Sequence, residues 1–307
     1  MSRGLSTKNS KISKDILDLV VNTSVFVFDC DGVVWKGQQA IDGARNVIQR
    51  LKLLNKKLFF VTNNSTQSRD GYQQKFNKLG FQVNGSEILS SSFAAALYLK
   101  EKNLFSNEGK KVYVVGEQGI CDELKLAQIP YIGGPEHCGK TIDYKAPEEI
   151  QIDQDIGAVV VGMDRGINYY KSQYAQLCLQ NPSTLFIATN EDATAHSTSD
   201  QEWAAGGTMV GAMKACSKRR PIVVGKPSSY LLDHLIKEHK ISPQEMCMVG
   251  DRLDTDILFG NQNGLKTLLV MSGVTTTEML HSDENEIYPS HSLDSLGHLS
   301  PYLDILE

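Results

Sequence analysis

The sequence predicts an α/β protein in which parallel strands alternate with helices. Short apolar runs recur along the chain, and they are continuous rather than alternating in polarity, as in strands buried on both faces of a parallel sheet. Segments with helical periodicity separate them, which indicates right-handed strand–helix–strand crossovers. The expected strands are residues 24–28, 57–62, 111–116, 157–163, 184–189, 221–225, 245–250 and 266–271. The expected helices are residues 40–54, 68–79, 169–180, 208–216, 229–239 and 255–263.

The length favours two domains. At 307 residues the chain exceeds the size at which a single hydrophobic core usually stops growing. The middle of the sequence carries its own strands and helices, so we expect a discontinuous core domain, residues 1–106 and 207–307, interrupted by a second domain, residues 107–206. Gly206 and Gly207 are expected to form a hinge between them, because glycine absorbs backbone rotation cheaply.

Composition argues against several classes of protein. Hydrophobic residues make up 41% and charged residues 22% of the chain, which is ordinary globular usage and unlike a disordered or fibrous protein. The formal net charge is −5, and basic residues are not interleaved with aromatics, so no nucleic-acid partner is expected. Apolar runs fall short of the ~20 residues that span a bilayer, so no membrane partner is expected either.

The cysteines indicate a reducing compartment. The 6 cysteines are scattered without a CxxC pair or a metal-binding spacing, and several lie in apolar runs where thiols pack as small hydrophobes. We therefore expect a cytoplasmic location. Residues 1–15 are polar and basic and lack the apolar stretch of a secretory signal, and they are expected to form a frayed tail.

Polar side chains follow four of the expected strands. Asp29 and Asp31 follow the first strand, and Thr62 to Ser65 (TNNS) follow the second. Lys226 follows the VVG run, and Asp251 follows the CMVG run. Each motif alone is more typical of a turn or a helix cap. Because the carboxyl ends of parallel strands meet at one edge of a sheet, the four together predict a single site.

These residue types suit phosphoryl transfer. Two carboxylates one residue apart repel each other, and a divalent cation would offset that repulsion. Mg²⁺ prefers octahedral oxygen ligands, which Asp29, the backbone carbonyl of Asp31 and Asp251 can supply. The cation would also neutralise a phosphate for attack by Asp29 as nucleophile. Lys226 adds positive charge beside the phosphoryl oxygens, and Asp31 is placed to protonate the leaving oxygen and later to deprotonate water.

The turn after the second expected strand supplies hydrogen-bonding groups. The Thr62 hydroxyl and Asn63 can bond the remaining phosphate oxygens, and Asn64 is a further candidate substrate-binding residue. Gly32 lets the chain leave the first strand in a tight turn, so that both acids of the DCD motif face one cavity.

The ordered set FDCDGV, VTNNS, VVGKP and MVGDRLDTDI resembles the haloacid dehalogenase (HAD) superfamily of aspartyl-phosphate phosphatases. The long insertion after VTNNS is similar to the α/β cap of type C2 in that family. The longer stretches VTNNSTQSRDGY and MVGDRLDTDILFGN resemble the eukaryotic 4-nitrophenylphosphatase, phosphoglycolate phosphatase and pyridoxal phosphate phosphatase group. The resemblance implies a Rossmann-like core, a Mg²⁺ cofactor and a homodimer formed through the cap.

The resemblance also implies roles for individual residues. It makes Asp29 the nucleophile, Asp31 the general acid/base and a backbone metal ligand, and Asp251 the second metal carboxylate. It gives Thr62 and Asn63 contacts to phosphate. Lys226 becomes the lysine of the third motif. The resemblance also makes Asp256 an outer-shell acid that orients metal-bound waters or Lys226.

Substrate choice is expected to depend on the cap. Residues 189–199 (TNEDATAHSTS) resemble the cap loop that reads the substrate in this group, but they match neither the phosphoglycolate-type nor the pyridoxal-type pattern. His196 is a candidate contact to the leaving group, and an ordinary surface histidine is the alternative.

The favoured function is a Mg²⁺-dependent phosphatase of small phosphorylated metabolites that forms a phospho-aspartate at Asp29, of the phosphoglycolate or 4-nitrophenyl phosphate type. The alternative in the same class is a pyridoxal phosphate or broad sugar-phosphate phosphatase. A non-catalytic phospholigand-binding module would be expected to lack the nucleophile, which this chain has. A response-regulator-like phosphoacceptor would need neither the large insertion nor Asp31.

Overall fold

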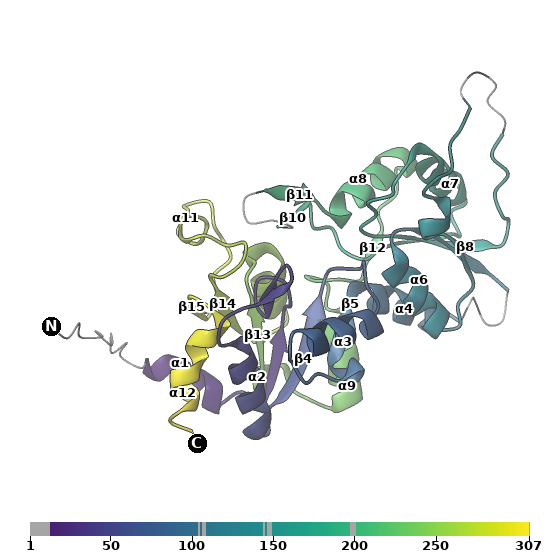
Figure 1. The fold of residues 1–307 in the computed structure, drawn as a ribbon. Coiled ribbons are helices and arrows are strands. Elements are labelled where there is room, and N and C mark those ends of the chain that lie inside the picture. The colour runs from purple at the N-terminus through teal and green to yellow at the C-terminus, as the bar shows by residue number, and fades with distance from the viewer. Residues whose placement is uncertain are drawn as a thin grey trace.

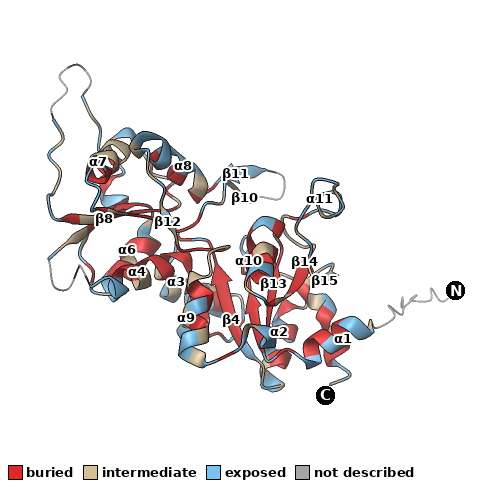
Figure 2. Cartoon of the chain, turned by 180° about the vertical axis from the view of Figure 1, so that it is seen from behind, coloured by how far each residue is buried: buried red, intermediate tan, exposed pale blue. Residues whose placement is uncertain are grey.

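The chain folds into two parallel sheets with helices packed on both, which confirms the expected α/β class. The computed structural model describes residues 13–103, 105, 109–143, 145, 149–196 and 201–306. Figure 1 shows the sheets in two halves of the molecule, with α4 and α6 at the junction between them. Figure 2 shows that buried residues line both sheets and the helix faces turned toward them.

The first sheet is built from the two outer parts of the chain. Among the described residues it has six parallel strands in the order β15-β14-β13-β1-β4-β5. The strands are β1 (Val25–Phe28), β4 (Lys57–Thr62), β5 (Ile88–Ser90), β13 (Met246–Gly250), β14 (Lys266–Val270) and β15 (His291–Leu293). Every residue of the central strands β1 and β13 is buried, as their continuous apolar sequences predict.

The second sheet contains five parallel strands within the described ranges, in the order β12-β9-β8-β6-β7. The strands are β6 (Lys111–Val115), β7 (Tyr131–Gly133), β8 (Ile156–Val161), β9 (Leu185–Ala188) and β12 (Ile222–Val223). The remaining strands of the described residues form two pairs: β2 (Trp35–Lys36) with β3 (Gln39–Ala40), and β10 (Thr194–His196) with β11 (Glu202–Ala204).

Helices connect the strands of both sheets. They are α1 (Lys14–Val21), α2 (Ala44–Leu53), α3 (Arg69–Lys78), α4 (Ser91–Glu101), α6 (Gln118–Leu126), α7 (Tyr169–Leu179), α8 (Gly206–Ser217), α9 (Tyr230–His239), α10 (Leu258–Gln262), α11 (Thr277–Leu280) and α12 (Ser300–Leu303). Single turns occur at Gly85–Glu87, Gly134–His137, Pro243–Glu245 and Leu296–Leu299, and a π-helical turn, η4, spans Leu253–Ile257. In the described part of the chain, none of the helices has the length and apolar character needed to cross a membrane.

One apolar cluster joins the two sheets. It contains Val27 of β1, Leu99 of α4, Ile120 of α6, Val114 of β6 and Leu235 of α9, all buried. Separate clusters cover the outer face of each sheet, under α1, α2 and α3 on the first and under α7 and α8 on the second. The helices at the junction therefore bury apolar side chains toward both sheets at once.

The second sheet extends beyond the boundary predicted at residue 206. Helix α8 begins at Gly206, and β12 pairs with β9, with Ile222 beside Ile187. Gly207 lies in the first turn of α8, where an added Cβ would overlap the backbone oxygen of Glu191, so close packing rather than a loose hinge requires glycine there. The domain limits stay a prediction, but the strand before Lys226 belongs to the second sheet and not to the first.

The amino-terminal segment also differs from its prediction. Helix α1 begins at Lys14, and its buried residues Ile16, Leu19 and Val20 join the core beneath the first sheet. The end of the predicted tail is therefore ordered by packing, while residues 1–12 lie outside the described residues.

A buried ion pair connects α3 to α6. The Glu123 side chain is only 1% exposed, and the Arg69 guanidinium donates to both of its carboxylate oxygens at 3.0–3.2 Å. The guanidinium also lies 3.8 Å from the centre of the Phe93 ring. Arg69 thus supplies the counter-charge of the buried Glu123 carboxylate from the other half of the molecule.

We expect Arg69→Met to lower the free energy of unfolding by about 3 kcal/mol, because it leaves the Glu123 carboxylate buried without its counter-charge. Urea unfolding measures the loss. The matched control is Arg165→Met, which breaks the pair with Glu117; that arginine side chain is 69% exposed. The control should cost less than about 1 kcal/mol. Equal losses in the two variants would contradict the prediction.

Candidate active site

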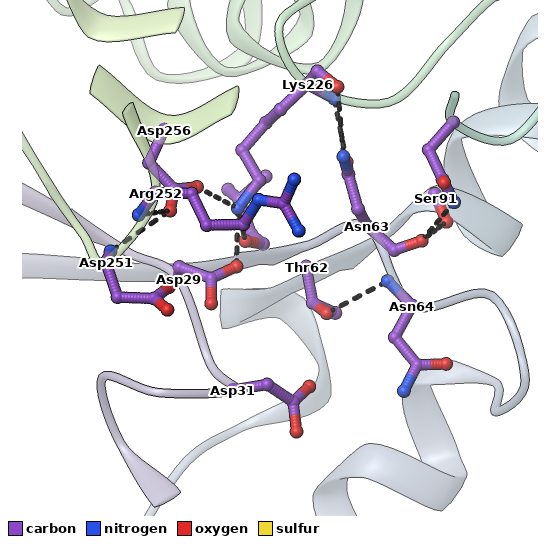
Figure 3. Close-up of polar contacts among 12 residues, drawn as sticks. Asp29, Asp31, Thr62, Asn63, Asn64, Ser91, Lys226, Asp251, Arg252 and Asp256 are labelled. Atoms are coloured by element: carbon purple, nitrogen blue, oxygen red, sulfur yellow. Dashed lines mark hydrogen bonds and ion pairs between the residues drawn. The ribbon is translucent and has the colours of Figure 1, made fainter. Parts of the chain in front are cut away.

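Asp29 and Lys226 form the centre of the site. Asp29 directly follows β1, and its backbone N–H bonds the carbonyl of Val249 at 2.9 Å, which continues the sheet pairing to this residue. The Lys226 Nζ donates to Asp29 Oδ1 at 2.5 Å, to Asp256 Oδ1 at 2.7 Å and to the carbonyl of Val61 at 2.8 Å (Figure 3). The lysine side chain is 2% exposed, so these three acceptors replace its water shell.

Two further acids come from the loop after β13. Asp251 directly follows the strand, and its Oδ2 accepts the N–H of Val274 at 2.7 Å. Asp256 lies in the π-helical turn η4, and its Oδ2 accepts the N–H groups of Asp251 and Arg252, each at 3.1 Å. Both oxygens of Asp256 thus accept hydrogen bonds from donors of the chain, and its outer-shell role stays a prediction.

The acidic cluster fits a hard divalent cation. Asp29, Asp251 and Asp256 offer carboxylate oxygens within 4.8 Å of one another, which is the donor type that Mg²⁺ prefers. Glycines leave room for these acids: Gly32 has a φ of +89°, and an added Cβ there would lie 2.5 Å from Asp251 Oδ2. A Cβ at Gly273 would overlap the same carboxylate. The chain therefore keeps Asp251 in a narrow cradle that side chains at either glycine would fill.

Burial perturbs the ionisation of these groups. It raises the pKa of Asp29 well above its usual range; the Lys226 charge opposes this rise, and the neighbouring acids Asp256 and Asp251 add to it. Burial, followed by the charge of Asp256, raises the pKa of Asp251 to about 7. Burial alone would lower the pKa of Lys226, but Asp256 and Asp29 outweigh it and raise that pKa, so the lysine stays charged. A bound cation would offset the cost of keeping both carboxylates ionised.

Asp31 lies apart from the buried cluster (Figure 3). Its side chain is 47% exposed, and its Oδ1 accepts the indole N–H of Trp35 at 2.8 Å and lies 3.8 Å from Lys75 Nζ. A carboxyl group at the solvent side of the nucleophile suits proton exchange with a leaving group and with water. Its roles as general acid/base and as a backbone metal ligand stay predictions.

The TNNS turn is built differently from its prediction. The Thr62 Oγ1 accepts the N–H of Asn64 at 3.1 Å, and the Asn64 Oδ1 accepts the N–H of Thr66 at 3.0 Å, so local bonds shape the turn. The Asn63 side chain bonds the backbone of Lys226 instead of pointing at Asp29 (Figure 3). A phosphate contact from Asn63 would therefore have to come from its backbone. Substrate contacts from Thr62 and Asn64 stay predictions.

The loop after β9, residues 189–193, lies within the segment 189–199 that resembles a substrate-reading cap loop, and it brings Asn190 and Asp192 to the site, two residues for which no role was expected. We call this segment the β9 loop. The carboxylate of Asp192 accepts the side-chain N–H of Asn63, and Arg252 Nη1 donates to the carbonyl of Thr194 at 3.0 Å, just beyond the loop. The motif TNED after an apolar run, which parallels TNNS after β4, was the signal available in the sequence. The side chain of His196 lies outside the described residues; its backbone pairs with Glu202 in the β10–β11 hairpin.

Comparison with known proteins identifies the family. A family model described as haloacid dehalogenase-like hydrolase matches residues 26–130, and one described as HAD-hydrolase-like matches residues 223–299. Phosphoglycolate phosphatase 1A, chloroplastic, from Arabidopsis thaliana is 51% identical over 288 residues, which cover 94% of this chain and 78% of that protein. The chain belongs to the haloacid dehalogenase-like hydrolases.

Solved structures of similar proteins agree with this assignment of the chain to the haloacid dehalogenase-like hydrolases. The p-nitrophenyl phosphatase from Archaeoglobus fulgidus superposes with a TM-score of 0.76 at 29% identity, covering 91% of this chain and 98% of that one. A glycerol phosphate phosphatase from Mycobacterium tuberculosis, solved in complex with magnesium, gives a TM-score of 0.73 at 26% identity, covering 90% and 77%. The relatives named here are phosphatases, and the hydrolase is an enzyme of that HAD phosphatase group.

The raised pKa of Asp251 predicts a pH-dependent stability in the metal-free hydrolase. A carboxyl group whose pKa rises on folding, here from 3.8 to about 7, stabilises the fold at low pH and loses that contribution as pH rises through this window. Relative to Asp251→Asn, the wild type should therefore lose on the order of 3 kcal/mol of unfolding free energy between about pH 4 and about pH 8. Urea unfolding in EDTA measures both proteins, and parallel pH profiles would contradict the prediction.

Proposed function

We propose that this hydrolase is a Mg²⁺-dependent phosphomonoesterase that acts through a phosphorylated Asp29. One observation carries the proposal: a buried carboxylate held by a buried lysine lies within 4.8 Å of two further acids at the carboxyl end of a parallel sheet. Bound between Asp29, Asp251 and the backbone oxygen of Asp31, Mg²⁺ would neutralise phosphoryl charge and favour in-line attack.

The residues of the chain divide the chemical steps between them. Lys226 holds Oδ1 of Asp29, so we assign Oδ2 to the attack on phosphorus, with the P–O bond to the leaving group breaking as the new bond forms. Asp31 donates a proton to the leaving oxygen. It then takes a proton from the water that attacks the phosphoaspartate, which releases inorganic phosphate and restores the carboxylate. Lys226 stays protonated throughout and stabilises charge on the phosphoryl oxygens.

The proposed substrates are small phosphorylated metabolites, with phosphoglycolate first. The support is the 51% identity to an enzyme named for that substrate. Arg252 adds positive charge near the acids, and its guanidinium pairs with Asp254 at 2.8 Å and donates to the carbonyl of Thr194 at 3.0 Å. A glycerol phosphate is the second candidate, because a solved relative is named for it. Pyridoxal phosphate remains the alternative that the sequence left open.

Location and assembly complete the proposal. All 6 cysteines are free thiols, which is typical of a reducing compartment and supports a cytoplasmic location. A homodimer through the inserted segment, as the family resemblance implies, would use a surface such as the β10–β11 hairpin, where Trp203 is exposed. Sedimentation of the full chain measures this assembly directly.

Asp29→Asn should lower kcat for 4-nitrophenyl phosphate by at least about 1,000-fold, because a neutral amide cannot form the acyl phosphate. The unfolding temperature should change little, since asparagine keeps the shape of the side chain and Asp256 remains as the counter-charge of Lys226. Asp283→Asn is the control, because it makes the same chemical change at an exposed acid. Turnover within tenfold of wild type in Asp29→Asn would end the nucleophile assignment.

A metabolite panel tests the substrate class. With Mg²⁺ present, kcat/KM should be highest for phosphoglycolate and at least about tenfold lower for pyridoxal phosphate, a difference of about 1.4 kcal/mol in transition-state binding. EDTA should abolish turnover of every substrate, and added Mg²⁺ should restore it. A clear preference for pyridoxal phosphate would favour the alternative, and turnover unaffected by EDTA would contradict the metal requirement.

A further inference from the structure

Asn63 clamps the backbone of the lysine at the centre of the site. Its Oδ1 accepts the N–H of Lys226 at 2.8 Å, and its Nδ2 donates to the carbonyl of the same residue at 2.9 Å. One primary amide therefore satisfies both backbone groups of Lys226, in the way that a neighbouring strand would. The dashed line between the two residues in Figure 3 marks this clamp.

The second sheet carries Lys226 to the clamp. Val224 continues the pairing of β12 with β9, since its N–H bonds the carbonyl of Ala188 at 3.1 Å. At Gly225 an added Cβ would lie 2.7 Å from Asn63 Oδ1 and would overlap the carbonyl of Thr189. Lys226 therefore follows an edge strand of the second sheet, and its side chain extends to the first sheet. The close contact at Gly225 leaves no room for a side chain there.

Two residues of the β9 loop bond Asn63, one at its backbone carbonyl and one at its side-chain amide. The Asn190 Nδ2 donates to the Asn63 carbonyl at 2.6 Å, and the Ser91 hydroxyl donates to the same oxygen at 2.6 Å. At the other end, both carboxylate oxygens of Asp192 lie 3.2 Å from Asn63 Nδ2. Of the two hydrogens on that nitrogen, one is used by the Lys226 carbonyl, and Asp192 is the acceptor for the second.

A charged acceptor at this point has two effects. A hydrogen bond to a carboxylate is roughly twice as strong as one to a neutral acceptor, so it fixes the rotation of the amide and keeps Oδ1 turned toward the Lys226 N–H. If the amide rotated or flipped, its NH₂ group would face that N–H and the clamp would be lost. Asp192 thus selects the orientation of Asn63 in which the amide matches the lysine backbone.

We propose that Asp192 is a positioning residue: from the β9 loop it orients Asn63, and Asn63 fixes the backbone of Lys226 so that the ammonium group meets Asp29. The proposal rests on the role assigned to Lys226 in the proposed function. It makes the placement of the lysine depend on the β9 loop, so a movement of that loop would be transmitted to the centre of the site through one amide group.

Two substitutions at Asp192 test the proposal. Asp192→Asn keeps the shape and a neutral acceptor, and it should lower kcat for 4-nitrophenyl phosphate about tenfold; Asp192→Ala removes the acceptor and should lower it about 100-fold. KM should change less than about threefold, because the substitution does not remove a substrate contact. Glu191→Gln is the matched control, an exposed acid one residue away that pairs with Lys214, and its kcat should be unchanged.

A double-mutant cycle separates positioning from a general structural effect. Asn63→Ala removes the clamp, so adding Asp192→Asn or Asp192→Ala to it should lower kcat by less than about twofold more. The proposal would be overturned if the kcat losses of the single variants multiplied in the double variants. A wild-type kcat in the Asp192 variants would overturn it too. If Asp192→Ala does not fold, the isosteric Asp192→Asn cycle decides the question alone. Asp29→Asn is measured in parallel: if it is inactive while the Asp192 variants are normal, only the positioning proposal fails.

Discussion

The buried ammonium group of Lys226 is the contact on which the site depends. It joins Asp29 after β1, Asp256 in η4 and the carbonyl of Val61 in β4, so two neighbouring strands and the turn that follows β13 meet at one charge. The Lys226 charge opposes the rise that burial causes in the pKa of Asp29, and the charges of Asp256 and Asp29 keep the pKa of the lysine high against its own burial. The glycine cradle and the Asn63 clamp then hold the partners of this one charge in place.

The sequence predicts the four central strands of the first sheet, β14, β13, β1 and β4, and the identity of the central acids, but it misses the edge strands β5 and β15. Expected strands at residues 57–62 and 245–250 match β4 and β13 within one residue, because continuous apolar runs bounded by polar turns leave little choice of limits. The HAD resemblance then places Asp29, Lys226 and Asp251 correctly in one cluster. The order of the motifs along the chain was sufficient for the two acids, because β1 and β13 are parallel neighbours in the first sheet. Lys226 joins them from the second sheet.

Three features were outside the reach of sequence patterns, each for a physical reason. An apolar run does not say which sheet it joins, so the strand before Lys226 was expected in the first sheet and lies in the second. Helix α4 is apolar on most sides because it lies between two sheets, which removes the periodicity that marks a helix. The residue type of Asn63 predicts hydrogen bonding, but whether the amide meets a ligand or the chain depends on Asp192 and Lys226, far away in sequence.

The apolar cluster beneath α4, α6 and α9 has a consequence for how the molecule comes apart. If one sheet moved away from the other as a rigid body, the apolar side chains of this cluster would be exposed to water. The free-energy cost would be about 25 cal/mol for each Å² of apolar surface exposed. Small displacements of the β9 loop and its hairpin avoid that exposure. On heating, the two sheets should melt in a single transition, because neither retains a complete hydrophobic interior once its neighbour is lost.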